Sequence, residues 1–329
     1  MQKKQHKKLN EMKLMCFMMA VAAVVITACN GSAGGRSAKA TDTIGVVTGE
    51  GGELPLPVMP SGITDPTERA DYLMAHFWDA MDFADGRLCR DTAFMEQNFV
   101  NFIQLHNYGT TDGSHAAMRR LLDAAVTSES AFATIRYVAE RYLNDPESPM
   151  RDERTWTVFL EELLATDELS EDDRLRPVAQ LATARKNSPG TVAADFSYVT
   201  RDGRRQTLHG APAARRTLLL FYDPSCEHCE EEITALRDND MLGMLVSGGA
   251  LRVLAVCAEE DRALWERTKS DLPADWTVAY DVSGILQKEL YALPAMPTIY
   301  VLDSDNTVVL KDPRMDVLYG WIADEASGL

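Results

Sequence analysis

The chain has 329 residues, which is long enough for two domains of ordinary size. Its formal net charge at pH 7 is −17, from 50 acidic and 33 basic side chains. An acidic chain of this kind is a poor partner for nucleic acid or for an anionic membrane surface, so we interpret the charge as a solvated surface.

The first 28 residues are predicted to be a signal peptide. They contain five lysines and one glutamate, so that the chain without them would carry a formal charge of −21. An apolar run at residues 14–26 follows the lysines and is too short for a permanent membrane span. The expected compartment beyond such a signal is oxidising, and disulfides persist there.

The sequence Ile26-Thr27-Ala28-Cys29 ends this segment and resembles the lipobox of bacterial lipoproteins, in which the cysteine is acylated. The resemblance implies that Cys29 attaches a lipid and that the protein binds the membrane through it. The alternative is an ordinary secretory signal with an incidental cysteine, but the small residues at 30–35 are typical of a flexible tether behind an anchor. No acidic run follows Cys29, and we expect a periplasmic protein on the outer rather than the inner membrane.

Residues 29–63 are rich in Gly, Ala, Ser, Thr and Pro and are predicted to be a flexible tether. Between 64 and 188 the apolar residues recur at helical spacing, which predicts an all-α domain. Its tryptophans and its lone His and Cys residues are interpreted as structural, because none has metal-like spacing. The expected helices lie at 64–83, 91–106, 114–126, 129–143, 153–164 and 171–185.

After residue 188 the pattern changes to alternating strands and helices, which predicts a second domain at 189–329. Its last two strands form a hairpin, so we expect a mixed α/β sheet that is covered on both faces. An Asp202-Gly203 turn joins the first two strands. The strands are expected at 193–198, 206–208, 218–222, 251–257, 276–280, 298–303 and 307–311. The helices are expected from the Cys226-Glu227-His228-Cys229 motif onward, at 260–269, at 283–291 and at 315–323.

Cys226 and Cys229 stand where a buried strand gives way to a helix. Two cysteines at this spacing can close a disulfide, and the helix N-terminus stabilises a thiolate at the first of them. A thiolate is the species that attacks a disulfide, so the pattern indicates thiol–disulfide exchange without a dissociable cofactor. Haem attachment would need a His in place of Glu230, and zinc would need further ligands at metal spacing. A structural disulfide on a redox-inert scaffold is the remaining alternative.

Two separated motifs connect the second domain to a known family. The Ala194-Asp195-Phe196 hairpin and the CEHC motif, followed later by Met296-Pro297 and the apolar strand at 298–303, resemble thioredoxin-like proteins of the TlpA/ResA type. The resemblance covers roughly residues 191–329 and implies a thioredoxin-like fold. The helical part resembles an uncharacterised domain that precedes such modules in Gram-negative envelope lipoproteins, and this implies no activity.

The resemblance implies roles for Cys226, Cys229 and Glu232, and the charges of the two residues between the cysteines add a separate effect. Cys226 matches the exposed attacking cysteine, and Cys229 matches the buried cysteine that resolves the mixed disulfide. Glu232 matches an acidic residue that relays the proton of the buried thiol, although it can equally be a solvated helix carboxylate. The imidazolium of His228 can stabilise the Cys226 thiolate, whereas Glu227 opposes it.

The resemblance also implies a substrate groove. Pro297 matches the cis-proline that faces the dithiol. A cis bond there turns the neighbouring backbone outward, so that Met296 and Thr298 can pair with an extended segment of substrate.

The function predicted from these features is a lipid-anchored periplasmic thiol–disulfide oxidoreductase. Its expected partners are envelope proteins that carry disulfides or thiols, together with a membrane redox donor, and neither a metal nor nucleic acid is expected. One alternative is a peroxiredoxin, which shares the Ala-Asp-Phe hairpin but needs a Pro…Thr…Cys spacing that is absent before Cys226. Another is a binding or scaffold protein in which the helical domain holds a partner.

Overall fold

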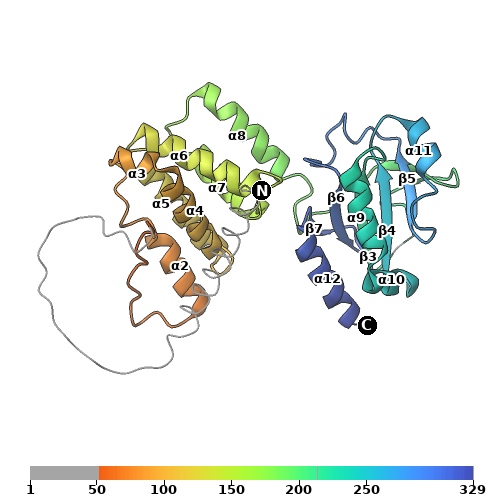
Figure 1. Cartoon of the computed structure of the whole chain (residues 1–329), viewed down its shortest axis with the longest axis horizontal. Helices are drawn as coiled ribbons and strands as arrows, with labels where there is room; N and C mark the ends of the chain where they lie inside the picture. The colour runs from red at the N-terminus through yellow and green to blue at the C-terminus, as the bar shows by residue number, and fades with distance from the viewer. Residues whose placement is uncertain (1–51, 213, 329) are drawn as a thin grey trace, which may run out of the picture. The chain divides into compact units, whose positions relative to one another are not determined.

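The computed structural model describes residues 52–212 and 214–328 (Figure 1). These residues form two compact units that divide between Val178 and Ala179, within the helix α8 (Glu171–Ala184). The boundary predicted from the sequence, between residues 188 and 189, lies just after the end of this helix. The predicted signal peptide, the lipid site Cys29 and the tether as far as residue 51 lie outside the described residues.

The first unit is built from helices in the described residues that follow 65. Side chains of Asp65, Asp91, Thr110, Ser128 and Asp152 accept hydrogen bonds from free N–H groups and begin five of these helices. The α5 helix packs against α2, α6 and α7, while α4 packs against α2, α3 and α6. The elements are α2 (Pro66–His76), α3 (Gly86–Arg90), α4 (Thr92–Leu105), α5 (Thr111–Ala125), α6 (Glu129–Ala139), the π-helical turn η2 (Glu140–Asn144), α7 (Glu153–Ala165) and α8.

The first helix is shorter than the sequence predicts, since α2 ends at His76 rather than near residue 83. The N–H groups of Phe77 and Met81 bond to carbonyls three residues back, so that tight turns replace the helix. Phe77 and Met81 are nevertheless both buried. Because they are four residues apart, their apolar side chains also fit the spacing of a helix. The part of the predicted tether that the structure describes is attached to the helical unit and is not free. Leu54 is buried there, and its N–H donates a hydrogen bond to the side chain of Asn98 in α4 (2.8 Å).

Two buried polar groups in this unit have opposite environments. His106 follows the end of α4, is 1% exposed, and neither of its ring nitrogens has a hydrogen-bond partner among the described residues. Burial lowers its pKa to about 4. Glu162 of α7 instead accepts hydrogen bonds from His115 (2.7 Å) and Arg119 (2.7 and 3.1 Å) of α5. Burial alone would raise the pKa of Glu162, but these bonds lower it.

The second unit contains a mixed seven-stranded sheet with the order β2-β1-β5-β4-β3-β6-β7, which confirms the predicted α/β sheet. The central strand β3 pairs in parallel with β4 and antiparallel with β6, and β4 pairs in parallel with β5. The strands are β1 (Ser197–Thr200), β2 (Arg205–Thr207), β3 (Arg216–Tyr222), β4 (Leu251–Cys257), β5 (Thr277–Asp281), β6 (Thr298–Asp303) and β7 (Val308–Lys311).

The two faces of this sheet are covered differently. One face packs against residues of four helices: α9 (Glu227–Arg237), α10 (Asp240–Ser247), α11 (Arg262–Thr268) and α12 (Met315–Ser327). Figure 1 shows α9, α10 and α12 against the strands. The other face packs against Phe196 and against the loop that carries Ile285 and Tyr291. The helix α10 was not predicted from the sequence.

The helix predicted at 283–291 is wrong, because this segment forms only turns. The carboxylate of Asp281 accepts from the N–H groups of Ser283 and Ile285, both at 2.7 Å, and thereby holds the start of the loop to the end of β5. Glu289 has a positive φ of 47°, which ends the turn. The apolar residues at helical spacing are those that the loop buries against the sheet. None of the helices in the described residues has the length and apolar character needed to cross a membrane.

Candidate active site

The CxxC motif lies where β3 ends and α9 begins. Asp223 follows the strand, and its carboxylate accepts hydrogen bonds from the N–H (2.7 Å) and hydroxyl (2.8 Å) of Ser225, which fixes the turn. Cys226 is then the N-cap of α9, and its sulfur accepts from the N–H of Cys229 at 3.3 Å. The first thiol therefore lies at the helix N-terminus, as the sequence predicts.

The two thiols, both free, differ in exposure. Cys226 is partly exposed, whereas Cys229 is fully buried in the core beneath α9. Burial raises the pKa of the Cys229 thiol to about 12, and this rise is opposed by a hydrogen bond from the backbone of Asp223. Cys226 and the Asp223 carboxylate raise the pKa of Cys229 further. The predicted order of an accessible first thiol and a buried second thiol is thus present.

The Met296–Pro297 peptide bond is cis, as predicted. The Cys226 thiol lies 3.6 Å from the carbonyl oxygen of Met296, which is 70 positions away in the sequence. The pairing of Phe221 in β3 with Thr298 in β6 brings the two loops together, because the end of one strand lies beside the start of the other. The Thr298 side chain is buried and donates to the Ala295 carbonyl (2.5 Å). The Thr298 side chain is therefore not available for contact with a substrate.

Two other predicted site residues, His228 and Glu232, lie on α9 beside the dithiol. The side chain of His228 is 62% exposed, and its ring lies 3.8 Å from the carboxylate of Glu231 on the next turn of α9. Glu232 is half-buried and acts electrostatically on the phenol of Tyr319 in α12, whose pKa is raised mainly by burial.

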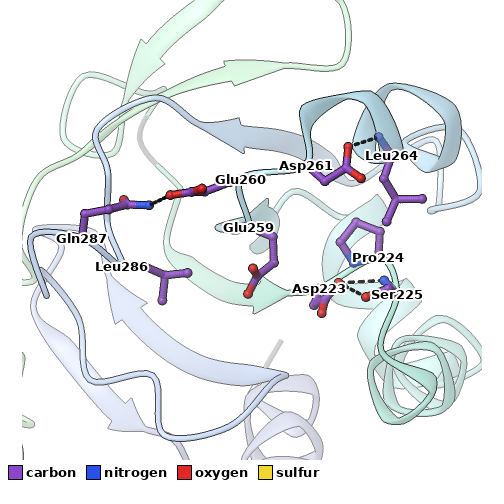
Figure 2. A pocket seen from close by; sticks show the side chains of 9 residues that line it. All are labelled: Asp223, Pro224, Ser225, Glu259, Glu260, Asp261, Leu264, Leu286 and Gln287. Atoms are coloured by element: carbon purple, nitrogen blue, oxygen red, sulfur yellow. Dashed lines mark hydrogen bonds between the residues drawn. The ribbon is translucent and has the colours of Figure 1, made fainter.

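An acidic cavity beside the motif was not predicted. It has a volume of about 470 Å³ and is lined by the three loops that follow β3, β4 and β5, together with Leu264 of α11 (Figure 2). These loops lie together because parallel strands bring their carboxyl ends to one edge of the sheet. Among the described residues no group of three or more His, Cys, Asp or Glu side chains is arranged to hold a metal. The lining residues are Asp223, Pro224, Ser225, Glu259, Glu260, Asp261, Leu264, Leu286 and Gln287.

Glu259 lines this cavity, and Cys257, two residues before it, is buried in the core. Burial raises the pKa of Glu259, and the carboxylates of Asp223 and Glu260 raise it further. Cys257 lies opposite Tyr222 in the β3–β4 register, in the same buried cluster as Cys229. Burial raises the pKa of the Cys257 thiol to about 11. The sequence signal for the cavity was the presence of acidic residues directly after two buried strands.

Comparison with known protein families gave a match in the first part of the chain. Residues 28–187 match a family described as a domain of unknown function, DUF5106. The comparison with curated proteins gave no match.

Three solved structures illustrate the likeness of the chain to known proteins. A conserved protein of unknown function from Bacteroides fragilis is 35% identical over 41% of this chain and 98% of its own, with a TM-score of 0.40. A thiol-disulfide oxidoreductase from the same species is 20% identical over 41% and 98%, with a TM-score of 0.36. A thioredoxin-like protein from Bacteroides caccae is 32% identical over 82% of this chain and 98% of its own, with a TM-score of 0.76. On this last likeness, which spans both units, the chain belongs to the thioredoxin-like proteins.

Proposed function

We propose that the chain is a thiol–disulfide oxidoreductase of the bacterial cell envelope that works through Cys226 and Cys229. The observation that carries this proposal is the asymmetry of the two thiols. Cys226 is accessible at the start of α9, and Cys229 is buried one turn along the same helix. This arrangement suits attack on a substrate disulfide by the first thiol and release of the substrate by the second.

The reaction needs no further cofactor. The Cys226 thiolate attacks one sulfur of the substrate disulfide, and the other substrate sulfur leaves with the bonding electrons. Cys229 then attacks Cys226, so that the pair becomes a disulfide and the substrate has gained two electrons and two protons. A membrane redox donor would return the pair to the dithiol.

The envelope location and the lipid anchor at Cys29 belong to the same proposal and rest on the sequence of residues 1–35. A short apolar segment behind lysines, the lipobox resemblance and the small residues after it support them. The partners that fit such a protein are envelope proteins with disulfides or accessible thiols.

Reduction of insulin by dithiothreitol tests the activity with the purified full chain. We expect faster insulin reduction with the wild type, and the rate of the uncatalysed reaction with Cys226→Ser. Cys89→Ala is the matched control, because Cys89 is a buried thiol of the helical unit, and it should retain the wild-type rate. A wild-type rate no greater than that of dithiothreitol alone would contradict the proposal. Peroxide consumption measured in parallel would then distinguish a peroxide reductase from a scaffold protein.

A further inference from the structure

The loop between β5 and β6 carries the group that faces the attacking thiol. The carbonyl of Met296 in this loop lies 3.6 Å from the Cys226 sulfur. Residues 282–297 contain neither helix nor strand, so the loop runs outside the hydrogen-bonded ladder of the sheet. The position of such a segment depends on the side chains that bond to its backbone. Any residue that fixes this loop therefore also fixes the space in front of Cys226.

Asn187 holds the middle of this loop. It comes three residues after the end of α8, on the helical side of the boundary that the sequence predicts, but it belongs to the second unit. Its side-chain nitrogen donates to the carbonyl of Leu290 (2.9 Å), and its side-chain oxygen accepts from the N–H of Ala194 (2.8 Å). One partly buried side chain thus joins the loop to the segment that precedes β1.

The backbone of Asn187 also fits this position. Its φ is 49°, in the left-handed region that asparagine and glycine adopt more readily than other residues. The neighbouring Lys186 donates to the carboxylate of Glu289 in the same loop (2.8 Å), but the Glu289 side chain is 76% exposed. An ion pair so exposed to solvent contributes little. Asn187 is therefore the main link between the end of α8 and the loop.

Two tyrosines hold the next two residues of the loop. The Tyr291 hydroxyl donates to the carbonyl of Ala194 (2.6 Å), and the Tyr300 hydroxyl of β6 donates to the carbonyl of Ala292 (3.0 Å). Residues 290–292 are thus each fixed by one side-chain hydrogen bond, and Met296 follows four residues later. Both tyrosines are buried against the sheet, whereas the first of the three bonds comes from outside the sheet. That bond can therefore be removed without a change in the core.

We propose that Asn187 is a positioning residue for substrate binding: its bond to Leu290 keeps the loop, and with it the backbone of Met296, at the distance from Cys226 that suits an extended substrate segment. This inference rests on the proposed function. Asn187 touches neither the sulfur atoms nor the substrate and takes no part in the transfer of electrons. It gives the end of α8 a role in how tightly a protein substrate binds.

The test is insulin reduction by dithiothreitol with the full chain, measured over a range of insulin concentrations so that KM and kcat are obtained separately. Asn187→Gly removes both side-chain bonds and keeps the positive φ without strain. Asn187→Asp keeps an acceptor for the Ala194 N–H but has no donor for the Leu290 carbonyl. Asn306→Gly is the matched control, because Asn306 also has a positive φ, of 60°, and lies in the turn between β6 and β7.

We expect both Asn187 variants to raise the KM for insulin about fivefold, which corresponds to about 1 kcal/mol, the ordinary contribution of one hydrogen bond. The kcat should change by less than about twofold, since the lost interaction affects binding and not the chemical step. Amide hydrogen exchange of residues 291–296 should be faster in both variants, while that of β3 is unchanged. Asn306→Gly should change neither KM nor the exchange of this loop.

A small disulfide, 5,5′-dithiobis(2-nitrobenzoate), shows whether the dithiol itself is intact. Its reaction with the reduced chain needs no pairing with an extended segment, and the Cys226→Ser/Cys229→Ser variant gives the background from the other cysteines. The rate should stay within about twofold of the wild type in both Asn187 variants. A loss of this reactivity together with kcat would show general damage to the unit and would overturn the positioning role.

Two further results would overturn the inference while the proposed function stands. One is a wild-type KM in both Asn187 variants of an active enzyme. The other is a raised KM in Asn187→Gly but not in Asn187→Asp, because the effect would then come from the bond to Ala194 and not from the loop. If the wild type does not accelerate insulin reduction at all, the proposed function fails and the inference fails with it.

Discussion

Replacing His106 by leucine should make the helical unit less sensitive to acid. His106 is buried at the end of α4, with its ring against Phe102 (centroids 4.9 Å apart), and neither ring nitrogen has a partner among the described residues. Burial lowers its pKa from 6.5 to about 4, while Asp152 and Arg154 have smaller, opposite effects. The folded unit therefore holds this histidine neutral over a pH range in which the unfolded chain protonates it.

The magnitude follows from the difference between the two pKa values. At about 1.4 kcal/mol per pKa unit, His106 contributes about 3 kcal/mol to the pH dependence of unfolding. Because the folded state has the lower pKa, stability is fully present above pH 6.5 and falls as the pH drops towards 4. By pH 4.5 the loss from this residue alone should be about 2.5 kcal/mol. At pH 7 the leucine variant should be as stable as the wild type or slightly more so, since it removes an unpaired N–H from the core.

Urea unfolding at pH 7 and pH 4.5 measures this difference. Amide hydrogen exchange of α4 and α7 should report the unfolding of the helical unit, because tryptophans occur in both units and their fluorescence is mixed. His209→Gln in the other unit is the control and should leave the exchange of α4 unchanged. Carboxylates that titrate in this range contribute equally to wild type and variant. An equal pH dependence in the wild type and in His106→Leu would refute the reasoning.

Three further predictions can be tested with single substitutions. Cys229→Ser should accumulate mixed disulfides with envelope proteins on non-reducing gels and Cys226→Ser should not; trapping by the second variant would reverse the assignment. Cys29→Ala should move the protein from the membrane to the soluble fraction, and retention in the membrane would argue against lipid attachment. Glu162→Gln should lower the free energy of unfolding of the helical unit by about 1–3 kcal/mol at pH 7, because it weakens charge-assisted bonds in a buried position. This difference should shrink as the pH falls below the ordinary glutamate value of 4.5, since the pKa of Glu162 is lowered in the folded state.

Local patterns predicted much of the sheet and the dithiol. The apolar runs at residues 218–222 and 251–257 form buried strands because only central strands bury both faces. As predicted, Cys226 begins α9, because the turn at Asp223 separates the start of this helix from the end of β3. These features depend on neighbours in the sequence, so a single sequence is sufficient to find them.

The features that the sequence did not predict depend on the order of the strands. The acidic cavity exists because β3, β4 and β5 are neighbours and in parallel, which brings Asp223 and Glu259 to one edge. The sequence has no local signal for this adjacency. The sequence predicts a helix at 283–291, where Leu286 and Leu290 recur four residues apart, but in the structure these residues pack against the sheet from a loop, together with Ile285 and Tyr291. Glu232 follows Cys229 by three residues, and its carboxylate acts electrostatically on Tyr319 of α12.

The pairing of β3 with β6 also means that the surroundings of the CxxC motif are complete only once the C-terminal part of the chain has folded. Met296 approaches the Cys226 thiol only when a strand from far along the sequence has joined the central one. A chain cut before Thr298 would carry the CxxC motif but lack the strand that holds the opposing loop in place. It would also leave one side of β3 without a hydrogen-bonding partner and open to association with other strands. Removal of the residues from Thr298 onward would therefore leave both cysteines in the chain but take away the strand that holds the Met296 loop beside them.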